Sequence, residues 1–398
     1  MKMFLLAAAM LLMPVSTSAR ASHRVTVTAF PITIIDDLGD HVRLERAPKR
    51  ILTLDASDTE ILFALGLEKR LVGDGSKYSE GATGISRDFR YPSEWPSTAG
   101  RDYPIRAKRL THIEGGYGTI PFDLETIEKL QPDVIFSLNS DHPALQKMRD
   151  LGLKVIVNNP GNLRGVLKDV ALAGRATGTA QRASVVLATM NRQLAAVRSR
   201  VARLRARPRV YYEIDATNPL EPFTAGPGTF VDDAIHLAGG RNVADAVRTC
   251  SGTGCYPQLT LESLVRFDPQ VIVLADAPYG TTTASVEARS GWNTMAAVRG
   301  GKIYPINPDL LSRPGPRVMV GLQALMRLIH RQTPSRPSSS LVSGPHGRAT
   351  VLPPFDRSPN DQPKVSENRW IATKSFDGPV CYVRRGRQAT TSFGPRPA

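Results

Sequence analysis

Apolar and polar positions along the middle of the chain follow two different periods. Short apolar runs, such as residues 51–54, 71–73 and 271–273, have the length of buried strands. Between them lie longer segments with apolar residues at helical spacing, and Gly or Pro usually ends each segment. Strands that alternate with helices in this way predict an α/β fold with mainly parallel sheets and helices on both faces.

One unit of this pattern occurs twice, 137 positions apart, at residues 123–136 and 260–273. Leu, Glu, Pro, Val and Ile fall in the same register in both copies. Each copy predicts a short amphipathic helix, a Pro that ends it, and a buried strand. Such a unit is also common in α/β proteins in general. Because the unit occurs again 137 positions later, the sequence favours two lobes of similar structure with a cleft between them.

The segment between the two copies predicts the connection between the lobes. Residues 163–205 contain no Pro and are rich in Ala, Leu, Val, Arg and Gln, so they predict one or two long helices with a break near Gly174 or Gly178. We therefore divide the folded part of the chain into an N-terminal lobe, an inter-lobe helix and a C-terminal lobe, at residues 22–162, 163–207 and 208–330. Ser57 or Asp58 is expected to cap the first helix of the N-terminal lobe.

The start of the chain predicts export. Lys2 precedes an apolar run at residues 4–13, and Ala-Arg-Ala at 19–21 has the small residues of a cleavage site. This is the pattern of a secretory signal peptide over residues 1–21, although a buried N-terminal helix is the alternative. The run is too short to span a bilayer. Because no Cys follows directly, we expect no lipid anchor and a mature periplasmic chain beginning near Ser22.

The other end of the chain has a different composition. Residues 331–398 hold 10 of the 31 prolines and a Pro-Ser-Ser-Ser cluster, without a sustained period. This predicts a disordered Pro/Ser/Arg-rich tail.

The net charge of +15 comes largely from that tail and from an Arg-rich stretch at residues 192–209. Such charge usually covers a solvated helix face, but it could also attract an anionic ligand or anionic lipid. Nucleic acid is not an expected partner of an exported protein. With 41% hydrophobic and 6% aromatic residues, the remainder is typical of a globular protein.

The cysteines and histidines indicate a disulfide and give little support for a metal site. Cys250 and Cys255 flank a Gly-rich loop, and an oxidising compartment favours a small disulfide there. Two thiols alone are too few ligands for a metal ion. His112, His142 and His236 form no tight motif, although they could still meet in space.

Patterns of enzymes are also lacking in the sequence. There is no Gly-x-Ser-x-Gly motif and no phosphate-binding P-loop. The acidic pair Asp36-Asp37 lies in a predicted turn between two short strands and is interpreted as structural.

Several segments, in this order and spacing, resemble periplasmic substrate-binding proteins for iron complexes and cobalamin. The resemblance covers roughly Thr28 to Ile329, and it implies two Rossmann-like lobes joined by a long rigid helix that permits only small closure. No single segment is decisive. The similar segments are Asp-Asp-Leu-Gly at 36–39, Pro-Lys-Arg-Ile at 48–51, residues 59–67, Leu-Val-Gly at 71–73, Pro-Phe-Thr-Ala-Gly at 222–226, residues 237–242, 291–298 and 301–304, and Arg-Pro-Gly-Pro-Arg at 313–317.

The resemblance also implies a function. The chain would be a monomer without an intrinsic cofactor that captures a metal chelate, either a ferric siderophore, a corrinoid or haem. It would deliver this chelate to an ABC permease dimer in the inner membrane without any enzymatic step. The alternatives are a secreted enzyme on a similar two-lobed scaffold, a haem- or bare-metal-binding protein of the same transport type, and a sensor domain.

Residue roles follow from the same resemblance. Glu125 and Glu262 match glutamates that engage Arg pockets on the two permease subunits. An N-terminal glutamate facing a helix dipole is the alternative, and both roles can hold together.

Five further residues match ligand-contacting positions, and Tyr78, in the loop after the second strand, is a sixth candidate; ordinary packing is the alternative for each. Tyr256 stands where relatives that resemble the cobalamin binder carry Trp; its ring keeps a stacking face and its hydroxyl could ligate iron or form a hydrogen bond. Trp292 is expected in the core. The six are Tyr78, Tyr117, Phe223, Tyr256, Asp309 and Arg313.

Overall fold

The computed structural model describes residues 29–75, 104–115, 121–138, 143–252, 254–331, and two short strands near the C-terminus. The expected signal peptide at residues 1–21 lies outside the described residues. Of the tail at residues 331–398, for which the sequence predicts disorder, the structure describes Arg331 and two short strands, β13 (Ile371–Ala372) and β14 (Tyr382–Val383), which form an antiparallel pair.

The first lobe is built on a five-stranded sheet in the order β5-β4-β3-β6-β7, in which all neighbours are parallel. An antiparallel pair, β1 and β2, precedes it, with the predicted Asp36-Asp37 turn between them. The elements are β1 (Ile32–Ile35), β2 (His41–Leu44), β3 (Ile51–Thr53), α1 (Ala56–Ala64), η1 (Glu68–Arg70), β4 (Leu71–Asp74), η3 (Ile105–Arg109), β5 (Thr111–His112), α2 (Leu124–Leu130), β6 (Val134–Ser137), α3 (Ala144–Asp150) and β7 (Val155–Val157).

Helix α1 begins one turn earlier than the sequence predicts. Its N-cap is Asp55, whose side chain accepts hydrogen bonds from the amides of Ser57 and Asp58. The same carboxylate accepts a third hydrogen bond from the amide of Leu138, at the end of β6. Asp55 therefore caps α1 and also binds the end of β6. This is why it is the N-cap instead of the two residues that the local pattern favours.

The second lobe repeats the central strand order as β10-β8-β11-β12, again parallel, with β9 added antiparallel to β8. Its elements are β8 (Arg209–Asp215), β9 (Phe223–Thr224), α6 (Phe230–Leu237), β10 (Arg241–Asn242), η4 (Val243–Ala246), α7 (Leu261–Phe267), β11 (Val271–Leu274), η5 (Ala277–Tyr279), α8 (Thr283–Glu287), η6 (Trp292–Thr294), α9 (Ala296–Arg299), β12 (Ile303–Pro305), α10 (Asp309–Ser312) and α11 (Val318–Ile329).

The repeat seen in the sequence is also a repeat in structure. Helices α2 and α7 both end on a residue with left-handed backbone, Gln131 (φ 42°) and Asp268 (φ 44°), directly before the Pro. An arginine at the start of each central strand binds the last carbonyl groups of the helix. Arg50 Nε donates to the carbonyl of Leu130 at 3.0 Å, and Arg209 Nε donates to the carbonyl of Phe267 at 2.9 Å. The similarity of the two lobes therefore extends to the backbone conformation at the helix ends and to the arginines that bind them, which the sequence repeat does not include.

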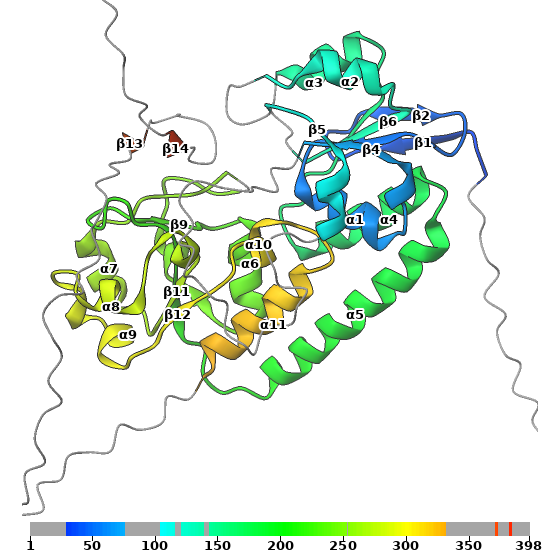
Figure 1. Ribbon diagram of the computed structural model, residues 1–398. Helices are drawn as coiled ribbons and strands as arrows, with labels where there is room; N and C mark the ends of the chain where they lie inside the picture. Colours follow the sequence, from blue (N-terminus) through cyan, green and yellow to red (C-terminus); the bar gives the residue numbers. More distant parts are fainter. Residues whose placement is uncertain are drawn as a thin grey trace, which may run out of the picture.

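Two helices join the lobes, α4 (Leu163–Ala176) and α5 (Ala180–Ala202), and α5 runs alongside both (Figure 1). The break falls at Thr177 to Thr179, where Gly178 has a φ of +73°. At the start of α5, Arg182 donates to the carbonyls of Leu65 and Gly66 in the first lobe, each at 3.0 Å. Farther along, α5 packs against α11 of the second lobe. Its buried residues share one helical face: Ala183, Met190, Leu194, Val197 and Val201.

A single hydrophobic core cluster runs through both lobes, from Ile34 to Ile329, by way of α4, α5 and α11. Each lobe also has a smaller cluster on the other face of its sheet, and Trp292 lies in that of the second lobe with 1% of its surface exposed, as predicted. Across the described part of the chain, no helix combines the length and apolar character needed to cross a bilayer.

Candidate functional site

Several polar side chains of the second lobe converge where its parallel strands end. Tyr212 lies on β8 and is 2% exposed. Burial raises its pKa above the ordinary range, and the nearby Tyr256, Asp276 and Asp309 raise it further. These three groups therefore lie close to one phenolic hydroxyl. In α/β proteins, the carboxyl edge of a parallel sheet is the usual place for a ligand.

Two of the expected ligand residues, Asp309 and Arg313, form an ion pair with 3.3 Å between Oδ2 and Nη2. About a fifth of each side chain is exposed. Burial raises the pKa of Glu60, a residue of α1 in the first lobe, and the positive charge of Arg313 is among the groups that oppose this shift. Arg313 therefore lies near the boundary between the lobes.

Beside the pair of Asp309 and Arg313, a buried ion pair joins the two lobes. The sequence analysis did not predict it. Glu60 accepts from Arg317 twice, from Nε at 2.8 Å and from the backbone amide at 2.7 Å. The two side chains are 1% and 5% exposed. Burial raises the pKa of Glu60, and Arg317 opposes that shift. The only sequence signal is the Arg-Pro-Gly-Pro-Arg motif ending at Arg317, which does not reveal its partner.

Tyr256 is 46% exposed, and a disulfide next to it fixes its loop. The structure joins Cys250 and Cys255, with 5.3 Å between their Cα atoms. The carbonyl of Cys255 accepts from the amide of Gly226 at 2.8 Å, and a Cβ at Gly226 would lie 2.3 Å from the Cys255 sulfur. Glycine is therefore needed at position 226 so that the two chain segments can approach.

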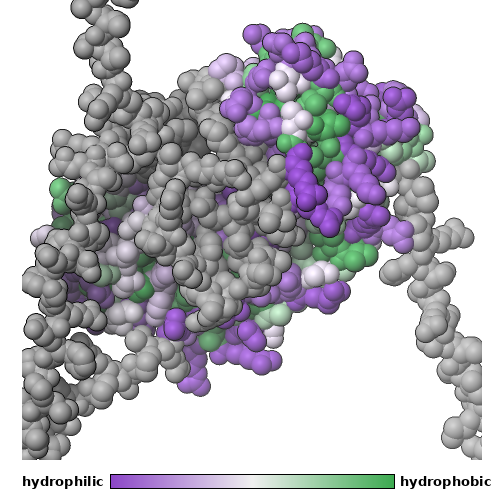
Figure 2. Space-filling view, in the orientation of Figure 1, coloured by the Kyte–Doolittle hydropathy of each residue, from purple (hydrophilic) through white to green (hydrophobic). Residues whose placement is uncertain are grey.

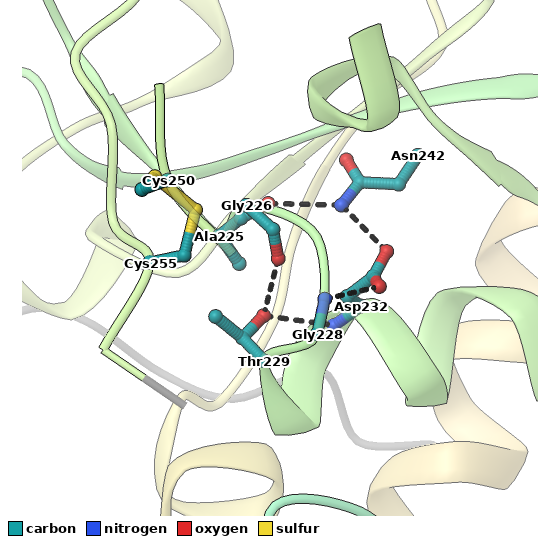
Figure 3. Close-up of a disulfide and its surroundings, with 8 residues drawn as sticks. All are labelled: Ala225, Gly226, Gly228, Thr229, Asp232, Asn242, Cys250 and Cys255. Carbon is teal, nitrogen blue, oxygen red and sulfur yellow. Dashed lines mark hydrogen bonds between the residues drawn. A yellow bond between two sulfur atoms is a disulfide. The ribbon is translucent and has the colours of Figure 1, made fainter. Parts of the chain in front are cut away.

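Figure 3 shows the loop at residues 225–229 between this disulfide and the side chains of Asp232 and Asn242. Just before the loop, partly buried Phe223 lies on β9 and forms a bridge with Gln258. The strand that carries Phe223 and the segment that carries Tyr256 are thus held side by side. Tyr78 and Tyr117, the expected aromatic residues of the first lobe, lie outside the described residues.

Glu125 and Glu262 occupy the same place in the two lobes, the first turn of α2 and of α7. Both are exposed, and Glu125 forms an exposed pair with Lys129 at 2.6 Å. The N-caps are the side chains of Asp123 and Thr260. Neither glutamate is therefore the side-chain cap of its helix, and both lie at the surface. On the face drawn in Figure 2, the described surface of the first lobe is largely hydrophilic.

A second buried charge pair lies deeper at the carboxyl edge of the second sheet. Arg289 donates to both carboxylate oxygens of Glu213, at 2.6 and 2.8 Å, and its guanidinium lies 4.5 Å from the centre of the Trp292 ring. Burial and the negative charge of Glu213 raise the pKa of the neighbouring Asp276 to about 8. Asp276 therefore lies beside this ion pair, and no local sequence motif predicts the network.

The two histidines that the structure describes among His112, His142 and His236 lie in different lobes. His112 lies in the first lobe with its Nε2 3.7 Å from Glu114, and His142 lies outside the described residues. His236 lies in the second lobe together with Asp232 and Asp245. The sequence reading did not group these three residues.

Comparison with known proteins places most of the two-lobed region in one family. The family described as "Periplasmic binding protein" matches residues 51–310. The ABC transporter substrate-binding lipoprotein YvrC of Bacillus subtilis is 26% identical over 309 residues, which cover 76% of this chain and 87% of that protein. A cobalamin-binding protein of Halobacterium salinarum is 29% identical over 311 residues, with coverage of 77% and 76%.

The fold agrees with this assignment. The structure of the periplasmic vitamin B12 binding protein BtuF of Vibrio cholerae superposes with a TM-score of 0.56 at 22% identity, covering 71% of this chain and 97% of that one. With the family match over more than half of the chain and two matched α/β lobes on a helical spine, the chain belongs to the periplasmic binding protein family.

Proposed function

We propose that this protein is the binding component of an ABC importer, which captures a metal chelate between its lobes in the periplasm and delivers it to an inner-membrane permease. The observation that carries the proposal is the matched pair of helices α2 and α7, each with an exposed first-turn glutamate. The family match and the names of the relatives support the transport role.

The ligand surface that we propose in the second lobe combines aromatic faces with a few charged groups. Tyr256 and Phe223 would stack on a large planar or macrocyclic chelate, and Asp309 with Arg313 would pair with its polar substituents. Tyr78 and Tyr117 are proposed for the facing wall. A ferric siderophore, a corrinoid and haem all fit this description, so the ligand class is decided by experiment.

Glu125 and Glu262 are proposed as the docking residues. A permease dimer has two-fold symmetry, and two like charges at matched positions on two lobes are complementary to a pair of basic pockets. Docking through exposed charges would mainly set the orientation and the association rate. Ligand binding would then be independent of both residues.

Only a small closure is expected when the ligand binds. The lobes share one hydrophobic core cluster, and the buried pair of Glu60 and Arg317 joins them. A helical spine permits less rotation than a hinge of flexible strands. Recognition would therefore depend on a surface that is largely formed before the ligand arrives.

The test is retention of a coloured ligand. The purified mature chain is incubated separately with a ferric hydroxamate siderophore, haemin and cyanocobalamin, passed through a desalting column, and its absorption spectrum is recorded. We expect one chromophore to remain, at about one molecule per chain. If none of the three ligands remained bound after desalting and the protein showed a hydrolytic activity, the secreted enzyme would be favoured instead.

Substitutions at Tyr256 then localise the ligand. Tyr256→Ala should weaken binding of the retained chelate, whereas Tyr256→Phe keeps the stacking face and tests the hydroxyl alone. Leu151→Ala removes a similarly exposed apolar side chain, 52% against 46%, from the first lobe and serves as the control, with unchanged affinity expected. An unchanged affinity in Tyr256→Ala would remove this residue from the site.

The proposed location rests on the signal pattern at residues 1–21. Expression of the full sequence in a Gram-negative host should give a periplasmic chain whose mass corresponds to a start near Ser22, without an attached lipid. The relative YvrC is named a lipoprotein, so a lipid-modified, membrane-bound product is the outcome that would contradict the absence of an anchor.

A further inference from the structure

Three side chains of the second lobe bring potential metal ligands together. Asp232, His236 and Asp245 each offer one ligand atom, and these atoms lie within 4.8 Å of one another. His236 Nε2 is 3.2 Å from Asp232 Oδ1 and 3.3 Å from Asp245 Oδ2. We propose that this triad binds a divalent transition-metal ion such as Zn²⁺, at a site separate from the proposed chelate surface and independent of the transport function.

The spacing of the ligand atoms fits a single ion. Asp232 and His236 are one helical turn apart on α6 and therefore share a face, and Asp245 faces them from η4. Two ligands bound to one zinc ion at about 2.1 Å are separated by roughly 3.0–3.4 Å. Both distances from the His236 nitrogen fall in that interval.

The most buried ligand is held in place by its surroundings, as in established metal sites. Asp232 is 8% exposed. Its Oδ1 accepts from Asn242 Nδ2 at 2.9 Å, and its Oδ2 accepts from the amide of Gly228 at 2.9 Å (Figure 3). Asn242 also donates to the carbonyl of Ala225 at 2.9 Å. The carboxylate is thus oriented before any ion binds.

The charges at the site favour a cation with two positive charges. Two carboxylates face one imidazole, so the site offers more negative than positive charge to a bound cation. The side chains of His236 and Asp245 are 46% and 40% exposed, which leaves a path for an ion and room for water ligands. One nitrogen and two oxygen ligands suit zinc and its neighbours in the first transition row.

A protonated His236 that bridges the two carboxylates is the competing explanation, and it needs no metal. The two explanations differ in what happens when zinc is added. A protonated bridge gives no saturable zinc binding at this triad, whereas the proposed site binds one ion and gains stability from it.

The experiment is calorimetric titration of the tag-free, chelator-treated mature chain with zinc chloride, with cobalt(II) absorption as a second signal. We expect one saturable ion per chain. His236→Gln and Asp245→Asn should each weaken zinc binding by roughly tenfold or more, since each removes a ligand. His112→Gln, the first-lobe histidine beside Glu114, is the matched control and should bind zinc as the wild type does.

Two more readouts separate this site from the rest of the molecule. Zinc should raise the unfolding temperature of the wild type but not that of His236→Gln, and Tyr256→Ala should keep the full zinc affinity. The proposal is overturned if the wild type shows no saturable zinc binding. It is equally overturned if His236→Gln and Asp245→Asn both retain wild-type affinity.

Discussion

At the scale of single residues, the most unusual group is Asp169 on α4, which is 0% exposed. In the described part of the chain, neither of its carboxylate oxygens has a hydrogen-bond partner. Burial, followed by the negative charge of Asp37, raises its pKa to about 8. Asp169 is therefore neutral in the folded protein over much of the range in which an unfolded chain would ionise it.

This shift has a defined consequence for stability. A raised folded pKa means that the native state holds a proton which the unfolded state releases above about pH 4. The contribution of Asp169 to stability is complete below that pH and is lost as the pH rises to about 8, by up to about 1.4 kcal/mol per pH unit. Asp169→Asn should flatten this decline and raise stability at pH 8.

Urea unfolding at several pH values between 4 and 9 measures the effect. Asp150→Asn changes an exposed carboxylate of the first lobe and should leave the pH dependence as it is in the wild type. If Asp169→Asn showed the same decline with pH as the wild type, the carboxyl group would not be the proton-binding group.

At the scale of elements, the disulfide loop is the one most closely linked to the proposed ligand surface. Cys250 and Cys255 close a short loop that packs on Gly226, and Tyr256 follows directly. A short loop stabilises a protein by only about 2 kcal/mol in the chain-entropy model. The larger effect of the disulfide should therefore be the position of Tyr256.

Replacing both cysteines with serine tests this expectation. The double variant should remain folded, with a modest drop in unfolding temperature, and should bind the retained chelate more weakly. Because Ser removes only the covalent link, treatment of the wild type with dithiothreitol should reproduce the loss. Unchanged chelate affinity in both cases would show that the loop holds Tyr256 without the disulfide.

The elements also show what sequence could and could not predict. Periodicity predicts α2 and α7, because their apolar face, first-turn acid and terminal Pro are all local. It also places Trp292 in the core. By contrast, the cap at Asp55 depends on Leu138, which is 83 positions away. A contact between distant segments does not change the spacing of apolar and polar residues within either segment, so it cannot be predicted from that spacing.

The same limit applies to the sites. The two cysteines of the disulfide are five positions apart, so spacing and compartment suffice to pair them. Glu60 and Arg317 are 257 positions apart, and only the folded lobes bring them together. Asp232 and His236 have helical spacing, but Asp245 joins them only because β10 adds beside β8. The candidate metal site is therefore visible in the structure alone.

At the scale of the whole molecule, charge and apolar contacts join the two lobes. Glu60 and Arg317 are both at least 95% buried. Removing one partner of a buried ion pair leaves the other charge without compensation, at a cost of roughly 3–5 kcal/mol. Glu60→Gln should lower the free energy of unfolding by about this amount.

A double-mutant cycle isolates the pair from other effects. The combination of Glu60→Gln with Arg317→Met should recover part of the loss, since no buried charge remains. Glu45→Gln breaks an exposed pair with Arg43 and should have little effect on urea unfolding. Additive losses in the double variant would mean that the ion pair does not join the lobes.

The central claim is that the molecule carries two separate surfaces, one for a chelate and one for a permease. The most direct measurement determines chelate affinity and uptake by the reconstituted permease in parallel, for the wild type and for the variants Tyr256→Ala, Glu125→Lys and Glu262→Lys. We expect Tyr256→Ala to lose affinity, and each charge reversal to bind the chelate normally while its uptake falls. Charge reversals that lose chelate binding but still support uptake from saturating chelate would contradict this account.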